Sequence, residues 1–179
     1  MIELRELVPG DADALLRIYS AKATQYLGRA PMDAAEARFY ARSAAASAAQ
    51  SPRALYTLGL VADDDVLGVV KLHLDRPVPS ISYILRRDAW GQGYATEGVR
   101  KILALAFSHL GLPEVSAKHH PDNSASGRVL TKAGFTPTGE HAGFLTYTIR
   151  PPAAASLFPH NRSTPWNAPP SSSPCSSTP

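Results

Sequence analysis

The 179-residue sequence is poor in cysteine and has no long apolar run. Its one cysteine, Cys175, excludes an intrachain disulfide framework and a thiol metal site. No run approaches the roughly 20 apolar residues that a membrane-spanning helix needs. The first residues, Met1 to Arg5, lack the basic-then-apolar pattern of a secretory signal. These absences favour a cytoplasmic protein without metal or membrane contact.

Charge of either sign is also scarce. Lys and Arg number 18 and Asp and Glu number 15, which gives a formal net charge of +3. This balance suits an anionic cofactor but does not by itself indicate nucleic acid. The basic pair Arg86-Arg87, a few residues before Trp90, is either a solvated loop or a phosphate contact, and both interpretations stay open.

Composition divides the chain near residue 150. Residues 151–179 hold eight of the 16 prolines, seven serines and no acidic residue. Such a segment cannot offset the entropy of ordering by burying apolar surface. We therefore expect one folded domain over residues 1–150 and a disordered tail over 151–179.

Hydrophobic periodicity predicts a mixed order of strands and helices over residues 1–150. A loop is expected at 24–31, after the first helix, and Asp33 with Glu36 forms a capping-box pattern at the second helix. A mixed, strongly twisted sheet with helices on both faces satisfies this order, which is of the α/β (α+β) class. Strands are expected near 2–7, 54–62, 66–74, 80–86, 115–119, 135–140 and 144–149, and helices after residue 11 and near 34–49, 94–110 and 123–133.

The stretch Trp90-Gly91-Gln92-Gly93-Tyr94-Ala95-Thr96-Glu97 joins an expected strand to an expected helix. The first N–H groups of a helix have no partner inside it, and the helix dipole places partial positive charge there. Glycine lets a phosphate come close to the backbone. The stretch is therefore either a pyrophosphate site or a plain strand-to-helix turn. It is neither a G-x-x-x-x-G-K-[ST] loop nor a G-x-G-x-x-G fingerprint, because Thr96 stands where the third glycine is needed.

A second segment, Pro121 to Phe135, begins with Asp122 or Asn123 as a helix cap and ends at Gly134. The two segments, W-G-Q-G-Y-A-T-E and N-x-x-S-x-x-V-L-x-K-x-G-F, together resemble the GNAT superfamily of acetyl-CoA-dependent N-acetyltransferases. The resemblance covers roughly residues 1–150. It is nearest to the Rim-type branch that acetylates the N-termini of ribosomal proteins and some small amines.

The resemblance implies that an amine attacks the thioester of acetyl-CoA directly, with no metal. Backbone N–H groups near the glycines would hold the pyrophosphate, and the pantetheine arm would bond between two parted strands, 80–86 and 115–119. A backbone N–H near Tyr83 to Leu85 would face the thioester oxygen, and Ser126 would serve the departing thiolate as a hydrogen-bond donor more than as a true acid. The implied cofactor-binding residues are Leu85, Trp90, Gly91, Gln92, Gly93, Tyr94, Ala95, Thr96, Asn123 and Ser126.

The general base is the point at which this chain departs from the family. Related enzymes often carry Glu where this chain has Ser80 or Ser82. Histidine is matched to the task by its ordinary pKa near 6.5. His73 and His120 are the candidates that we name as catalytic. Asp75, His119 and an acceptor that needs no protein base stay open as alternatives.

The acceptor is expected to be a small-molecule or peptide amine. Tyr26, Arg29, Ser82 and Tyr83 are the residues expected to contact it, and Arg29 would suit an acceptor carboxylate or phosphate. Two other functions stay open, namely use of another acyl donor, such as an aminoacyl-tRNA or a carrier-protein thioester, and non-catalytic CoA binding. Nucleic acid is expected as a partner only if tRNA is the donor, and the protein is expected to be a monomer or a homodimer.

Overall fold

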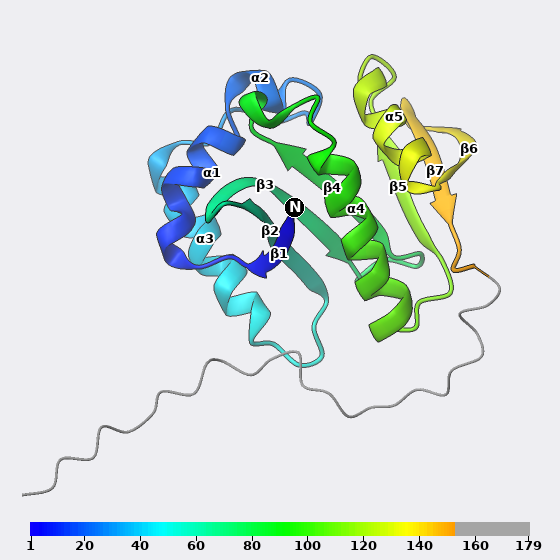
Figure 1. The fold of residues 1–179 in the computed structure, drawn as a ribbon, viewed down its shortest axis with the longest axis horizontal. Helices are drawn as coiled ribbons and strands as arrows, with labels where there is room; N and C mark the ends of the chain where they lie inside the picture. Colours follow the sequence, from blue (N-terminus) through cyan, green and yellow to red (C-terminus); the bar gives the residue numbers. More distant parts are fainter. Residues whose placement is uncertain (153–179) are drawn as a thin grey trace, which may run out of the picture.

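The computed structural model describes residues 1–152 of the chain. The tail predicted for 151–179, with Cys175, therefore lies almost wholly outside the described residues. Seven strands form a single mixed sheet in the order β1-β2-β3-β4-β5-β7-β6 (Figure 1). The strands are β1 (Glu3–Glu6), β2 (Leu55–Ala62), β3 (Asp65–His73), β4 (Ser80–Leu85), β5 (Val115–His119), β6 (Thr136–His141) and β7 (Phe144–Ile149).

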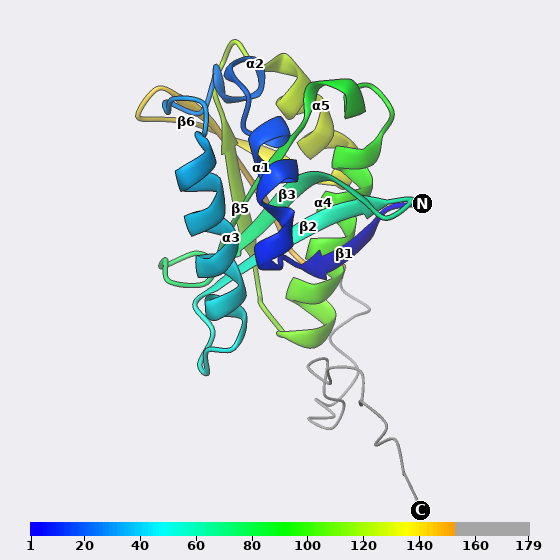
Figure 2. The same ribbon diagram turned by 90° about the vertical axis from the view of Figure 1, so that its left-hand side faces the viewer.

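Helices cover both faces of the sheet, as the sequence predicts (Figures 1 and 2). One face carries α1 and α3, and the core there includes Leu15 and Ile18 of α1 and Val69 and Ile84 of the sheet. The other face carries α4 and α5 over a second core that includes Val70, Leu72, Val99, Ile102 and Leu130. The helices are α1 (Ala12–Ile18), α2 (Ala21–Thr24), α3 (Ala34–Ala48), α4 (Tyr94–Ala104) and α5 (Ser124–Ala133).

The expected helix boundaries hold with two differences. The long helix predicted to Leu110 is α4 followed by a π-helical segment, Leu105–His109. Residues before the predicted 24–31 loop form the short helix α2, whose last residue, Thr24, donates its hydroxyl hydrogen bond to the carbonyl of Ser20 at 3.0 Å. A four-residue helix has too few residues to show a period, so the sequence does not reveal it.

The sheet opens between β4 and β5. These parallel strands pair in register at Ser80 and Ser116 alone. Beyond that point β4 continues to Leu85 and β5 to His119, and their carboxyl ends lead to the amino ends of α4 and α5. The expected parting of the two strands is therefore present.

Strand alternation decides which side chains face which layer. On β4, Ile81 and Leu85 belong to the core under α4, whereas Ile84 belongs to the core under α1 and α3. Ser82 therefore points to the α1 and α3 side, while its neighbour Tyr83 points to the α4 and α5 side. β4 thus places a serine hydroxyl on one face of the sheet and a tyrosine phenol on the other.

Gly68 allows β3 and β4 to lie close together. It pairs with Leu85, and an added Cβ would lie 2.5 Å from the carbonyl oxygen of Ile84 and 2.9 Å from Cγ of Leu85. We predict that Gly68→Ala lowers the free energy of unfolding by about 1–3 kcal/mol in urea denaturation. Gly10→Ala is the control, since its Cβ would meet nothing within 4 Å. A Gly68→Ala protein as stable as the wild type would contradict this strand contact.

Of the two caps that the sequence allows for α5, Asp122 and Asn123, the structure uses Asn123. Its side-chain oxygen accepts a hydrogen bond from the Ser126 N–H at 3.1 Å. Asn123→Ala removes this acceptor, and we predict a loss of about 1 kcal/mol in the free energy of unfolding. Asn123→Asp keeps an acceptor oxygen at the helix N-terminus and should stay near the wild-type stability. Equal losses in the two variants, measured by thermal and urea unfolding, would show that the cap contributes nothing.

Candidate functional site

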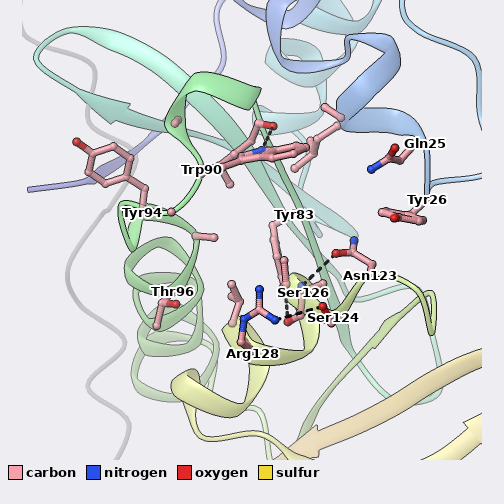
Figure 3. Close-up of a pocket in the computed structure, with 18 of the residues that line it drawn as sticks. Gln25, Tyr26, Tyr83, Trp90, Tyr94, Thr96, Asn123, Ser124, Ser126 and Arg128 are labelled. Carbon is pink, nitrogen blue, oxygen red and sulfur yellow. Dashed lines mark hydrogen bonds between the residues drawn. The ribbon is translucent and has the colours of Figure 1, made fainter.

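A pocket of about 500 Å³ lies where β4 ends and α4 and α5 begin (Figure 3). Four segments of the chain contribute to its walls: the α2 region, the end of β4, the glycine loop and α5. The sheet opening therefore leads directly into the pocket. Its lining includes Lys22, Gln25, Tyr26, Tyr83, Leu85, Trp90, Gly91, Gly93, Tyr94, Ala95, Thr96, Asn123, Ser126, Arg128 and Lys132.

The glycine loop has the backbone conformation that its sequence predicts. Gly91 and Gly93 have φ values of +77° and +84°, a region that residues with a side chain rarely adopt. Gly93 is the N-cap of α4, and no side chain caps that helix. The first N–H groups of α4 are therefore left for solvent or a ligand. The indole of Trp90 donates to the Leu85 carbonyl at 3.0 Å and so fixes the loop to the end of β4.

Basic side chains line the pocket from both ends. Lys22, Arg128 and Lys132 are among the lining residues, against a single carboxylate, Asp122. A pocket with this balance favours an anionic ligand. Sequence reasoning assigned no ligand role to these three basic residues. A sequence signal was present for Arg128, because it lies within the second motif, four residues after Ser124. In the structure its guanidinium donates a hydrogen bond to Oγ of Ser124 at 3.2 Å.

Tyr83 and Ser126 meet across the pocket (Figure 3). The Tyr83 hydroxyl lies 2.7 Å from Oγ of Ser126 and donates to the Ser126 carbonyl at 3.0 Å. Burial raises the pKa of Tyr83 to about 12, although the hydrogen bond to Ser126 acts in the opposite direction. Tyr83 is therefore a neutral phenol at pH 7. The pair offers two coupled hydroxyl groups at the start of α5.

His73 lies on the α1 and α3 side of the sheet, outside the residues that line the pocket. Its Nε2 is 3.5 Å from Oγ of Ser82. Burial lowers the pKa of His73 below its ordinary value, Arg76 and Lys71 lower it further, and Asp75 opposes them. The imidazole is therefore held neutral at pH 7 and can accept a proton.

His119, the last residue of β5, and His120, which follows it, have different surroundings. His119 is buried, with Nδ1 2.8 Å from the His120 carbonyl oxygen and Nε2 3.2 Å from the Tyr147 hydroxyl. A Cβ at Gly127 would lie 2.8 Å from its Nε2, so His119 fills space within the fold. The His120 ring instead stacks on Tyr26 at 5.6 Å, and Tyr26 lines the pocket. Of the two, His120 is the one close to the pocket.

Arg29 is held by neighbouring side chains. It pairs with Glu36, and its guanidinium lies 5.0 Å from the centroid of the Tyr19 ring. It does not line the pocket, and neither do Gln92 and Ser82. The structure thus brings most of the expected cofactor residues into one pocket and places Ser82, His73 and Arg29 outside it.

Neither a membrane-spanning helix nor a metal-binding group is found among residues 1–152. No helix in this range combines the length and apolar character needed to cross a bilayer. No group of three or more His, Cys, Asp or Glu side chains in the same range is placed to hold a metal ion.

Comparison with known proteins agrees with this architecture. Residues 2–136 match the family model described as the acetyltransferase (GNAT) domain. The uncharacterized N-acetyltransferase YoaA of Bacillus subtilis is 29% identical over 142 residues, which is 76% of this chain and 80% of that protein.

Two solved structures share the fold at low sequence identity. RimL, a ribosomal-protein alpha-N-acetyltransferase in complex with coenzyme A, superposes with a TM-score of 0.71 at 19% identity, covering 83% of this chain and 93% of that one. The aminoglycoside acetyltransferase AAC(6')-Ib with coenzyme A gives a TM-score of 0.70 at 17% identity, covering 87% and 96%. With the family match over residues 2–136, the resemblance read from the two motifs is confirmed: the chain belongs to the GNAT acetyltransferase family.

Proposed function

We propose that this protein transfers an acetyl group from acetyl-CoA to a primary amine, which attacks the thioester directly. The observation that carries the proposal is the uncapped N-terminus of α4, formed by Gly91 and Gly93 beside the parted strands β4 and β5. RimL and AAC(6')-Ib, which share the fold, are both described with bound coenzyme A. The acceptor amine would be a protein N-terminus or a small molecule.

The residues present fit coenzyme A. Backbone N–H groups from Gly91 to Ala95 would hold the pyrophosphate, because helix N-termini bind phosphate. Lys22, Arg128 and Lys132 line the same pocket and would add positive charge. The edge of β4 beyond Ser80 has unpaired N–H and C=O groups toward β5, and these can bond an amide chain as an added strand.

The chemical step needs a donor for the departing sulfur. Ser126 and Tyr83 lie together at the start of α5, and both are neutral hydroxyl groups at pH 7. The Ser126 hydroxyl would donate a hydrogen bond to the thiolate, and the Tyr83 hydroxyl would hold the serine in place. A β4 backbone N–H near Tyr83 to Leu85 would stabilise the oxyanion.

The incoming amine must lose a proton. An α-amine has an ordinary pKa of about 7.7–8.0 and is partly free at pH 7, whereas a lysine amine at about 10.4 is not. We propose His73 as the base and His120 as the alternative. His73 lies on the face of the sheet away from α4 and α5 and is held neutral by burial.

The positive φ of Gly93 provides a test of the pyrophosphate site. Gly93→Val forces a β-branched residue into φ +84° and tilts the first N–H groups of α4. We expect the Kd for coenzyme A, measured by calorimetry, to rise at least about tenfold. Gly111→Val is the matched control, because Gly111 has φ +65° but follows the other end of the helix. An unchanged Kd in Gly93→Val would remove the basis of the proposal.

The pH dependence of kcat/KM tests the base. For a reaction that needs a free amine, a plot of log(kcat/KM) against pH has a slope of one below the amine pKa. If His73 accepts the proton that the free amine loses as it attacks, both groups must be unprotonated, so the slope steepens to two below the lowered histidine pKa and His73→Gln restores a slope of one. His120→Gln should leave the profile unchanged. A steepening lost only in His120→Gln would assign the role to His120, and a slope of one in the wild type would show that no histidine acts.

The coupled hydroxyl groups can be tested separately. Ser126→Ala should lower kcat by about 10²-fold or more, because the thiolate loses its donor. The Kd for coenzyme A should change little, since the pyrophosphate contacts are elsewhere. An unchanged kcat in steady-state assays would exclude Ser126 from the chemical step.

A further inference from the structure

The sheet face away from α4 and α5 carries basic side chains on both sides of the opening. On β3, Lys71 pairs in register with Ser82 of β4. On β5, Val115 and Ala117 belong to the core under α4, so alternation directs Lys118 to the opposite face. One lysine therefore lies one strand in from the opening on the β4 side, and the other lies on the β5 side.

Lys71 lies against the ring of Tyr40, which in turn contacts Tyr19. Its ammonium group lies 4.8 Å from the centroid of the Tyr40 ring on α3. The Tyr40 hydroxyl lies 3.1 Å from that of Tyr19, and the Arg29 guanidinium lies over the Tyr19 ring. Burial lowers the pKa of Lys71, and the charge of Arg29 lowers it further, so the two cations act on each other. Ring faces attract a cation but do not neutralise its charge.

Lys118 is connected to the pocket by a series of rings. Its ammonium group lies 4.4 Å from the centroid of Phe144. The Phe144 ring meets His120 edge-on at 6.2 Å, and His120 stacks on Tyr26, a residue of the pocket wall. Lys118 therefore lies beside the rim through which a second substrate can approach the opening.

Carboxylates on this face do not balance the two lysines. Glu36 is paired with Arg29, and Asp75 acts on His73 together with the oppositely charged Arg76. Within residues 1–152, no carboxylate lies in ion-pair distance of Lys71 or Lys118. Two uncompensated positive charges thus flank the side of the opening that faces away from the proposed CoA pocket.

We propose that the acceptor is an anionic amine, which carries a carboxylate or phosphate near its amino group, and that Lys71 and Lys118 recognise this charge. The inference rests on the proposed function. The donor would enter from the side of α4 and α5, so an amine that attacks the thioester in the opening arrives from the other face. A polycationic amine would meet two like charges there, which disfavours it.

Matched acceptors test the inference. Initial rates of CoA release are measured with short peptides that differ only by Glu or Gln beside the N-terminal residue, with phosphoserine or serine there, and with a polycationic aminoglycoside. We expect kcat/KM to be about tenfold higher for the anionic member of each pair, and the ratio to fall as salt is added. The Glu and phosphoserine arms distinguish a carboxylate from a phosphate.

Three variants locate the effect. Lys71→Met and Lys118→Met keep the long side chain against Tyr40 and Phe144 but remove the charge. Each should bring the ratio of kcat/KM between the anionic and the neutral acceptor toward one, mainly through a change in KM. Lys101→Met removes the same charge from α4, on the other face of the sheet, and should leave the ratio unchanged. Lys118 is exposed, so its variant should fold even if the Lys71 variant does not.

The outcomes are distinct. Equal kcat/KM within each pair, or a preference for the aminoglycoside, would overturn the inference and leave the proposed function intact. Absence of turnover with every amine would count against the proposed function instead. In that case the anionic peptides are titrated by calorimetry in the presence of coenzyme A: weaker binding to Lys71→Met and Lys118→Met supports the anion site, and no binding to the wild type overturns it.

Discussion

The opening in the sheet depends on the limited pairing between β4 and β5. Ser80 and Ser116 form the only register pair of these two strands, and the Ser116 N–H and hydroxyl both donate to the Pro79 carbonyl, at 2.8 Å and 3.2 Å. Proline has no N–H, so the pairing cannot extend regularly before Ser80. Buried backbone groups need partners, and those of β4 beyond Ser80 find none on β5. The opening is thus a gap in the hydrogen bonding of the sheet, and a ligand backbone can complete it.

A second feature of β4 is that, in the proposed mechanism, it contacts both substrates. Tyr83 points to α5, where it meets Ser126, and its neighbour Ser82 points to the opposite face, beside Lys71 and His73. The separation is imposed by the period of two in an extended strand. A change at Ser82 therefore leaves the direction of Tyr83 unaltered. The two faces can be altered independently as long as the strand itself is kept.

The parts of the fold that the sequence predicts well are those with local signals. Strands β5 and β7 begin and end at the predicted residues, and Asn123 and Gly134 end α5 in their expected cap roles. The glycine loop is equally local, because positive φ values and a following helix follow from a few neighbouring residues. These features need no knowledge of distant contacts.

The parts that the sequence leaves open depend on contacts between distant segments. The choice between His119 and His120 is decided by Gly127 and Tyr147, which leave a buried space for His119 alone. The surroundings of Arg29 depend on Tyr19 and Glu36, neither of which is its neighbour in sequence. Lys71 and Lys118 are far apart in the chain, and only the strand order places them on either side of one opening.

The difference between locally predictable features and features that depend on distant contacts also applies to the proposed donor and acceptor sites. In the proposed mechanism the donor is held largely by main-chain groups at Gly91 to Ala95 and along β4, and many side-chain changes leave such groups in place. The proposed acceptor face consists instead of side chains such as Lys71, His73 and Lys118, where one substitution changes charge or shape. Fold similarity at 17–19% identity to RimL and AAC(6')-Ib is consistent with that difference, since these proteins have different acceptors in their descriptions but share coenzyme A. The acceptor of this protein must therefore be argued from its own side chains on that face, because the shared backbone does not specify it.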